Sequence, residues 1–144
     1  MKNGLPFTIL VEDDDEEDRE IIDEAFKRIG YESEVKKFLE GKSLLKYLDQ
    51  IDASLYPSLI VLDNSLPGLE VEWLILQIKN DERFKDIPIV VHSGTVSSTA
   101  EQKLTELGVY AILEKGTTMI DVVKVAQQLK DTAEAKRREN FERS

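Results

Sequence analysis

Five short segments with strand character, each followed by apolar residues at helical spacing, constrain the fold of this 144-residue chain most strongly. In the segments that follow, apolar residues recur every three or four positions, as they do in an amphipathic helix. Residues 98–101 have the spacing of a capping box, which predicts Ser98 as the cap of a helix that runs to about Leu107. Strands that alternate with helices at this spacing favour parallel pairing through right-handed crossovers. The sequence therefore predicts an α/β fold with a doubly wound, five-stranded parallel sheet. The five segments lie at residues 8–11, 34–38, 59–62, 89–92 and 110–113.

The simplest strand order for such a sheet is 2-1-3-4-5, the flavodoxin-like order. Folds of this kind support many functions, so the fold alone decides none of them. The third segment, residues 59–62, is apolar without a break and leads directly into Asp63. Such a run is typical of a strand buried on both faces, and Pro67 and Gly68 end it with turn chemistry. Asp63 is thus predicted at the carboxyl end of a central strand, where open α/β sheets bind ligands.

Composition narrows the class of function. A net charge of -10 argues against binding to nucleic acid or to an anionic membrane. The chain has no cysteine, which excludes disulfides and thiolate metal sites. Because no apolar run reaches the length of a membrane span and no signal-type segment is present, we expect a cytoplasmic protein.

The length indicates one domain, which we place at residues 1–130. Residues 131–144 are rich in charge and form an expected helical C-terminal extension. This extension is interpreted either as a solvated helix or as a contact with a partner or a second copy of the chain.

Polar groups follow four of the five predicted strands. Because parallel strands end at one edge of the sheet, these groups should converge there. By itself, Asp63 is explained equally well as a cap of the next helix, so the convergence carries the argument. The groups expected at this edge are Glu12, Asp13, Asp63, Ser93, Gly94 and Lys115.

Three carboxylates in one crevice, from Glu12, Asp13 and Asp63, repel one another unless a cation neutralises them. Mg²⁺ takes oxygen ligands, and the carbonyl of Ser65 could add one more. The alternative explanation for Glu12 and Asp13 is that a helix N-terminus favours negative charge. Lys115 is either a plain salt-bridge partner of a carboxylate or a strong hydrogen-bond donor to a phosphoryl group.

Ser93 adds a hydroxyl group, and the Gly94 N–H could approach an oxyanion without a side chain in the way. A carboxylate, a metal ion, a lysine and a hydroxyl together match the chemistry of an aspartyl phosphate.

These motifs resemble a response regulator receiver domain of two-component signalling, of the single-domain chemotaxis type. The resemblance covers residues 7–130 and implies that Asp63 accepts a phosphoryl group from a sensor histidine kinase or a histidine phosphotransfer protein. It also implies that Lys115 and Ser93 contact the phosphoryl group. The implied Mg²⁺ ligands are Glu12, Asp13, Asp63 and the backbone carbonyl of Ser65. The four motifs that carry the resemblance are residues 9–14, 62–68, 91–94 and 113–115.

We therefore expect a stand-alone signalling protein, not an enzyme, which passes its signal to an unidentified downstream protein and could form a homodimer. The alternative is a phosphorylation-independent binding or dimerisation module with the same fold. The chain departs from the family where proline usually follows the lysine, here Gly116, and where an aromatic residue precedes it, here Ile112 with Tyr110 nearby. A further glycine of the family is Val71 here, so we expect that loop to differ.

Three other candidates are weaker. Residues 41–43 resemble the end of a phosphate-binding loop but lack the glycine five positions earlier. His92 is the only histidine, and we interpret it as packed or partly exposed, since it has no partner for a metal site or a triad. Trp73 lies among apolar residues of a helix and is predicted to belong to the core.

Overall fold

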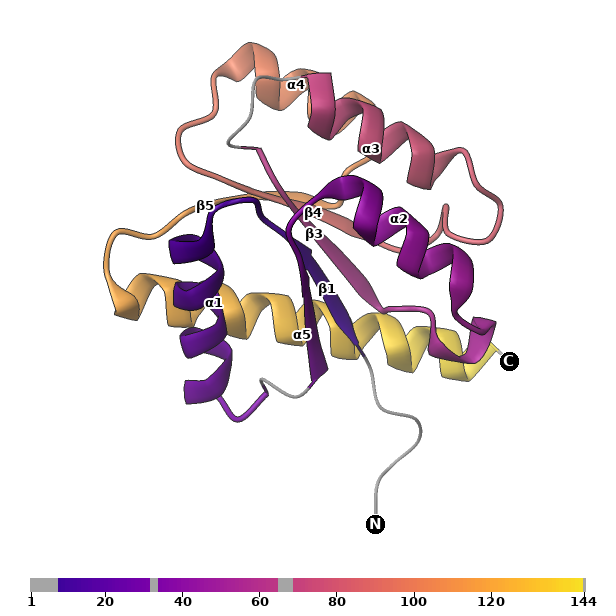
Figure 1. Cartoon of the computed structure of the whole chain (residues 1–144), viewed down its shortest axis with the longest axis horizontal. Coiled ribbons are helices and arrows are strands. Elements are labelled where there is room, and N and C mark those ends of the chain that lie inside the picture. Colours follow the sequence, from indigo (N-terminus) through magenta and orange to yellow (C-terminus); the bar gives the residue numbers. More distant parts are fainter. Residues whose placement is uncertain (1–7, 32–33, 65–68, 144) are drawn as a thin grey trace.

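The structure, a computed structural model, describes residues 8–31, 34–64 and 69–143. It contains a five-stranded parallel sheet in the order β2-β1-β3-β4-β5, which confirms the predicted fold (Figure 1). The strands are β1 (Ile9–Glu12), β2 (Val35–Phe38), β3 (Leu59–Asp63), β4 (Ile89–Ser93) and β5 (Ala111–Glu114). The helices are α1 (Glu16–Arg28), α2 (Gly41–Gln50), the 3₁₀ turn η2 (Ala53–Leu55), α3 (Leu69–Lys79), α4 (Ser98–Glu106) and α5 (Met119–Arg143).

The sheet is a middle layer between two groups of helices. The helices α1 and α5 cover one face, while α2, α3 and α4 cover the other (Figure 1). Side chains of β3 alternate between the two cores, with Leu59 and Val61 toward α1 and α5 and Ile60 and Leu62 toward the opposite helices. All four are buried. The unbroken apolar run is therefore a strand covered on both sides, and it fixes Asp63 at the centre of the carboxyl edge.

Helix α5 continues past residue 130 without a break. Ala133 is completely buried in the core that α1 and α5 share, and the Lys130 ammonium lies over the ring of Tyr31, 6.0 Å from its centroid. The helical character expected for the C-terminal segment is thus observed as far as Arg143. The first part of this segment packs against the domain, and the domain boundary at residue 130 stays a prediction.

Two local predictions were wrong. Trp73 is not in the core, because its side chain lies on the outer face of α3 and is 45% exposed. Helix α3 buries Val71 and Leu74 on its inner face, so Trp73 points toward solvent. The N-cap of α4 is Ser97, not Ser98, because the Ser97 hydroxyl accepts the Ala100 N–H at 3.1 Å.

Some predicted features lie outside the described residues: the Ser65 carbonyl ligand and the turn at Pro67 and Gly68. Within the described ranges, no helix is both long enough and apolar enough to cross a membrane. The peptide bonds of these ranges are all trans, including the one between Lys115 and Gly116.

Candidate functional site

The sheet brings the predicted polar groups to one edge. In the parallel pairing, Glu12 lies opposite Leu62, and Asp63 lies opposite His92. Strand β4 in turn pairs with β5, and the Lys115 N–H donates to the carbonyl oxygen of Ser93 just beyond this pairing. The ends of β1, β3, β4 and β5 are therefore neighbours, as the order of the strands requires.

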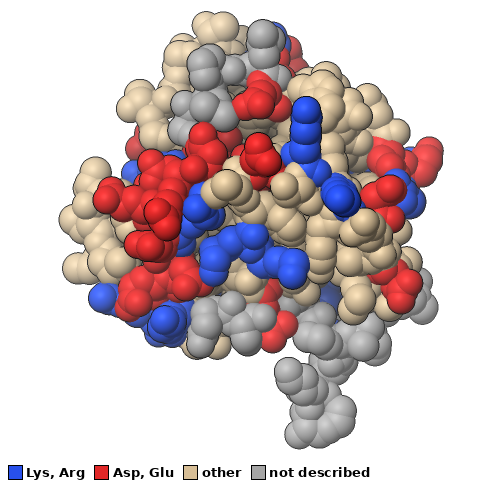
Figure 2. Space-filling model, viewed as in Figure 1, with Lys and Arg blue, Asp and Glu red and all other residues tan. Residues whose placement is uncertain are grey.

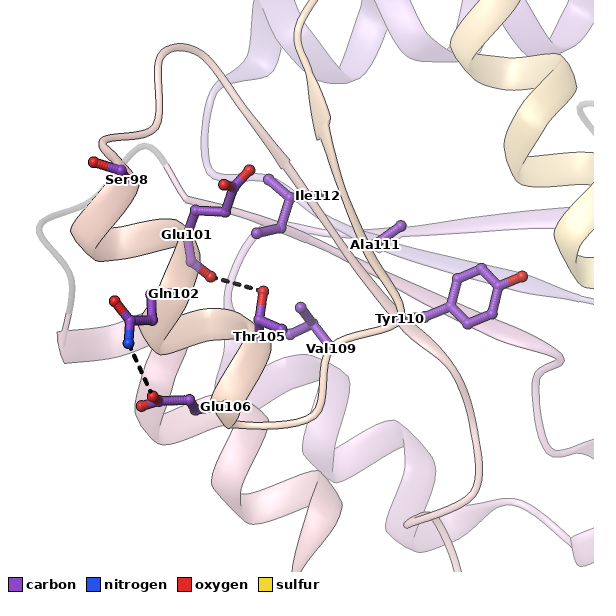
Figure 3. Close-up of a pocket in the computed structure, with 9 residues that line it drawn as sticks. All are labelled: Ser98, Glu101, Gln102, Thr105, Glu106, Val109, Tyr110, Ala111 and Ile112. Carbon is purple, nitrogen blue, oxygen red and sulfur yellow. Dashed lines mark hydrogen bonds between the residues drawn. The ribbon is translucent and has the colours of Figure 1, made fainter.

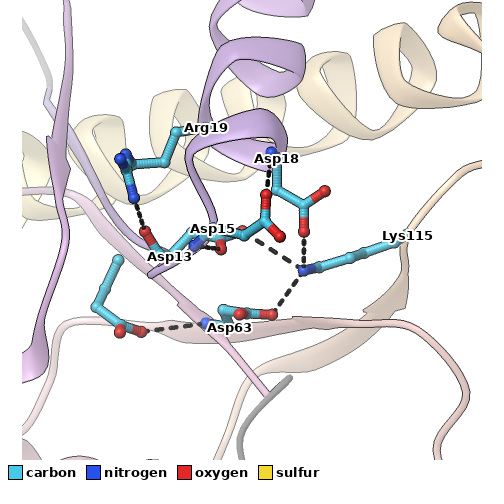
Figure 4. A network of polar contacts seen from close by, with 7 residues as sticks. Asp13, Asp15, Asp18, Arg19, Asp63 and Lys115 are labelled. Atoms are coloured by element: carbon cyan, nitrogen blue, oxygen red, sulfur yellow. Dashed lines mark hydrogen bonds and ion pairs between the residues drawn. The ribbon is translucent and has the colours of Figure 1, made fainter.

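Lys115 is the centre of this cluster (Figure 4). Its Nζ lies 2.7 Å from an oxygen of Asp63, 2.7 Å from one of Asp18 and 3.4 Å from one of Asp13. Burial lowers the pKa of Lys115, but the hydrogen bonds to Asp18 and Asp63 and the charge of Asp13 outweigh this effect, so the pKa is raised overall. The ammonium group is therefore charged at physiological pH and is shared among three carboxylates.

Asp18 was not predicted as part of the site. The Asp15 side chain caps α1 by accepting the Asp18 N–H at 3.0 Å, and the Asp15 N–H in turn donates to the Asp13 carboxylate. This capped first turn points the Asp18 carboxylate toward Lys115 (Figure 4). A helix N-terminus favours negative charge anywhere in its first turn, so this preference does not distinguish Asp18 from its neighbours. The useful signal is the position of Asp18 three residues after the cap.

Asp13 is a buried acid with several partners. Burial raises its pKa to about 6; the Asp15 N–H opposes this shift, and repulsion by Asp63 adds to it. The Arg19 guanidinium donates to the Asp13 carbonyl oxygen at 2.7 Å, which holds the backbone at the end of β1. The charge of Lys115, whose Nζ lies 3.4 Å from the Asp13 carboxylate, partly offsets the repulsion.

Glu12 also lies at the carboxyl edge of the sheet, but its side chain contacts the neighbouring strand β3. Its carboxylate accepts the Asp63 N–H at 3.4 Å. Burial raises the pKa of Glu12 to about 7; the bond from Asp63 opposes the shift, and repulsion by Asp63 and Asp13 adds to it. The ionised form of Glu12 is therefore destabilised by burial and by the neighbouring carboxylates, and a nearby cation would stabilise it.

The donor set fits a hard cation. Carboxylate oxygens of Asp13, Asp14 and Asp63 lie within 4.8 Å of one another. Mg²⁺ prefers oxygen ligands of this kind and keeps several waters, so such a partial set is sufficient. Asp14 had been named only as part of the motif, and Glu12 is not in this group. The direct coordination expected of Glu12, like that of Ser65, stays a prediction.

Ser93 and Gly94 are placed differently from each other. Ser93 is 3% exposed, whereas the position of a Cβ at Gly94 meets open space. A backbone group at Gly94 is thus accessible from solvent. The contacts of Ser93 and Gly94 with a phosphoryl group stay predictions. His92, as expected, is packed: burial and the charge of Lys115 lower its pKa to about 4. Its Nε2 is buried and has no hydrogen-bond partner among the described residues.

The departures from the family have structural counterparts. A Cβ at Gly116 would overlap the Asp121 Cβ and would lie 3.1 Å from backbone atoms of Asp121 and Val122. Only glycine therefore lets the loop after Lys115 lie so close to the first turn of α5. Ile112 is partly buried on the sheet face that carries α4, while Tyr110 is 64% exposed.

A groove lies between α4 and β5, with a volume of about 370 Å³ (Figure 3). Carboxylates of Glu101 and Glu106 belong to its lining, and none of its lining residues is basic. The side-chain bonds drawn there link only residues of α4, from Thr105 to Glu101 and from Gln102 to Glu106.

A flavodoxin-like parallel sheet with an acidic cluster facing a lysine at its carboxyl edge is the architecture of two-component receivers. The family model described as the response regulator receiver domain matches residues 9–127. This chain belongs to that family, whose members are signalling modules.

Several relatives resemble the chain over most of its length. The probable methanogenesis regulatory protein FilR2 of Methanothrix harundinacea is 27% identical over 128 residues, which cover 88% of this chain and 83% of the relative. The response regulator Rcp1 of Synechocystis is 27% identical over 129 residues, which cover 88% of each. The chemotaxis protein CheY1 of Helicobacter pylori is 30% identical over 83 residues, or 58% of this chain and 64% of the relative.

Solved structures agree with this assignment. The Mn²⁺-bound form of Rcp1 has a TM-score of 0.70 at 25% identity and covers 87% of this chain and 92% of the solved chain. The phosphorylated cyanobacterial phytochrome response regulator RcpA has a TM-score of 0.74 at 24% identity, with coverage of 87% and 91%. Because the match to RcpA is below 25% identity, it shows the shared fold alone.

Proposed function

We propose that this chain accepts a phosphoryl group on Asp63 from a sensor histidine kinase or a histidine phosphotransfer protein, with Mg²⁺ as cofactor. The contact between the Lys115 ammonium and Asp63 carries the proposal. It places a permanent positive charge beside a carboxylate whose side chain is only 4% exposed, at the strand end that such sheets use for ligands.

The transfer conserves atoms and charge. An oxygen of Asp63 attacks the phosphorus of a phosphohistidine, and the P–N bond breaks. The ring nitrogen keeps the electron pair and takes up a proton from water, so the histidine leaves as a neutral imidazole. Lys115 stays close to the attacked group and offsets the negative charge of the phosphoryl oxygens. Asp13 and Asp14, with Asp63, are the residues that would hold Mg²⁺. The bound ion would neutralise charge on the phosphoryl oxygens during transfer.

Two relatives support a histidine kinase as the phosphoryl donor and a divalent cation as the cofactor. The sensor histidine kinase CheAY of Helicobacter pylori contains a stretch that is 27% identical to this chain over 122 residues, or 15% of that protein. Rcp1 was solved in a Mn²⁺-bound form. Both facts favour a divalent cation and a histidine kinase system for this chain.

The output follows from the charge that is gained. The phosphoryl group carries about -1.5 to -2 charge and replaces the single negative charge of the Asp63 carboxylate, next to the buried Ser93 at the end of β4. We expect Ser93 and the loop that leads to α4 to move inward, which changes the groove between α4 and β5 and its affinity for a downstream protein. Coupling of this kind is typically about 1–3 kcal/mol.

The direct test incubates the protein with acetyl phosphate and Mg²⁺ and measures its intact mass. We expect a gain of one phosphoryl group in the wild type and none in Asp63→Asn. Asp52→Asn is a matched control, because Asp52 is exposed and precedes η2 at the other end of β3. An adduct of equal amount in Asp63→Asn would overturn the proposal. No adduct from small donors or from phosphohistidine would favour the phosphorylation-independent binding module.

A further inference from the structure

Lys115 has two short ion pairs, and only one of them involves the proposed phosphoacceptor. Its Nζ lies 2.7 Å from Asp63 on one side and 2.7 Å from Asp18 on the other (Figure 4). The two acids come from different elements, since Asp63 ends β3 and Asp18 belongs to the first turn of α1. The ammonium therefore bridges the sheet edge and a helix.

The two partners differ in what the reaction would do to them. Asp63 loses its free carboxylate when it becomes an acyl phosphate, and its oxygens are also among those that would hold a cation. Asp18 is not in the group of oxygens that could bind the ion, so its charge is unchanged at every stage. Of the two short ion pairs, only the one with Asp18 remains available throughout.

Asp18 is also well fixed. Its N–H is bound by the Asp15 cap, and its position follows from the start of α1. The side chain is 35% exposed, whereas that of Lys115 is 18% exposed, so the pair is partly shielded from water. A pair of this kind is expected to be stronger than one on the open surface.

We propose that Asp18 is a positioning residue that holds the Lys115 ammonium beside Asp63. Because Asp18 shares the ammonium, it limits how strongly Lys115 competes with a cation for the oxygens of Asp13 and Asp63. This role rests on the proposed phosphorylation of Asp63, and it adds a residue of α1 that acts through Lys115.

Asp18→Asn tests the proposal, and Glu17→Gln is its matched control. Both variants remove one negative charge from the first turn of α1, but Glu17 is exposed and has no contact with Lys115 among the described residues. Figure 2 shows the acidic side chains gathered over α1, and Glu17 belongs to this helix. The comparison therefore separates the specific contact from the general loss of charge.

The first measurement is the dissociation constant for Mg²⁺ by calorimetry. Without Asp18, the Lys115 ammonium should be shared by Asp13 and Asp63 alone and should compete more strongly with the ion. We expect the constant to rise by roughly threefold to tenfold in Asp18→Asn relative to Glu17→Gln. Phosphorylation by acetyl phosphate at saturating Mg²⁺ should slow by a similar factor because Lys115 is misplaced. Asp18→Glu should restore part of both losses.

The second measurement repeats the pair of variants in a Lys115→Met background. If Asp18 acts through Lys115, Asp18→Asn then changes Mg²⁺ affinity and the thermal midpoint no more than Glu17→Gln does. Equal effects of Asp18→Asn with and without Lys115, or effects equal to those of Glu17→Gln in the wild type, would overturn the proposal.

The two proposals fail in different ways. If the wild type gains no phosphoryl group, the proposed function fails, while the affinity and thermal measurements still judge the contact between Asp18 and Lys115. If the wild type is phosphorylated and Asp18→Asn matches Glu17→Gln in every measurement, the proposed function stands and the role of Asp18 is wrong.

Discussion

The acidic cluster around Lys115 and the groove between α4 and β5 are built in opposite ways. In the cluster, Lys115 contacts Asp13, Asp18 and Asp63, which are far from it in sequence, and the Asp13 and Asp63 side chains are 6% and 4% exposed. In the groove, the side-chain bonds join residues four positions apart on α4. The cluster is therefore fixed by long-range contacts, whereas the groove wall can change without breaking the contacts of the cluster.

This contrast suits a protein in which one region receives a signal and the other transmits it. Buried ion pairs are costly to break, so the acidic cluster should tolerate little change. Exposed pairs contribute little, so the surface near α4 should tolerate much.

The largest expected effect comes from the lysine at the centre of the acidic cluster. Lys115→Met removes the cation shared by the three carboxylates, and we expect phosphoryl uptake from acetyl phosphate to fall by about 100-fold or more. Lys103→Met is the matched control on α4, because Lys103 has an exposed ion pair with Glu72. Intact-mass kinetics should show a change below about twofold in this variant. Similar losses in both variants would remove the contrast between the two regions.

A second prediction concerns the loop that carries the lysine. Gly116→Ala places a Cβ against the backbone of α5, so we expect a loss of about 1–3 kcal/mol in the free energy of unfolding. Gly94→Ala faces open space and should leave stability within about 1 kcal/mol. Urea denaturation measures both. An unchanged midpoint for Gly116→Ala would show that α5 yields easily at this contact.

The third prediction is a pH dependence. Glu12 has a pKa of about 7 in the folded protein and an ordinary value of 4.5, so between these values the folded state binds more protons than the unfolded chain. Without a divalent cation, the free energy of unfolding should therefore fall as the pH rises from about 5 to 7. The raised pKa of Asp13 acts in the same direction.

Glu12→Gln should flatten this dependence in urea titrations at several pH values, and Glu17→Gln should keep it. A wild-type stability that rises over the same range would contradict the burial of an ionisable Glu12.

The smallest effect is expected at the start of α4, beside the groove. Ser97→Ala removes the oxygen that accepts the Ala100 N–H, and we expect a loss of about 1 kcal/mol in the free energy of unfolding. Ser98→Ala should change it by less than about 0.5 kcal/mol. The reverse order in thermal melts would restore Ser98 as the cap.

Much of the fold was predictable because its signals are local. The alternation of strand and helix segments gave the parallel sheet, and the apolar run before Asp63 gave its central, doubly buried strand. The convergence of Asp13, Asp63 and Lys115 then followed from strand direction alone. Trp73 was misplaced because a helix with apolar residues on several sides does not reveal which side meets the sheet.

The sequence by itself determined the class of sheet and the edge at which chemistry is possible, because side-chain periods of two and 3.6 residues are properties of neighbouring positions. Only the tertiary structure decided that Asp18 shares Lys115 with Asp63, and that Gly116 has no room for a side chain. These facts depend on where α1 begins and how closely α5 approaches the loop. Both features depend on distances between segments that are far apart in the sequence, and no short stretch of the chain predicts such distances.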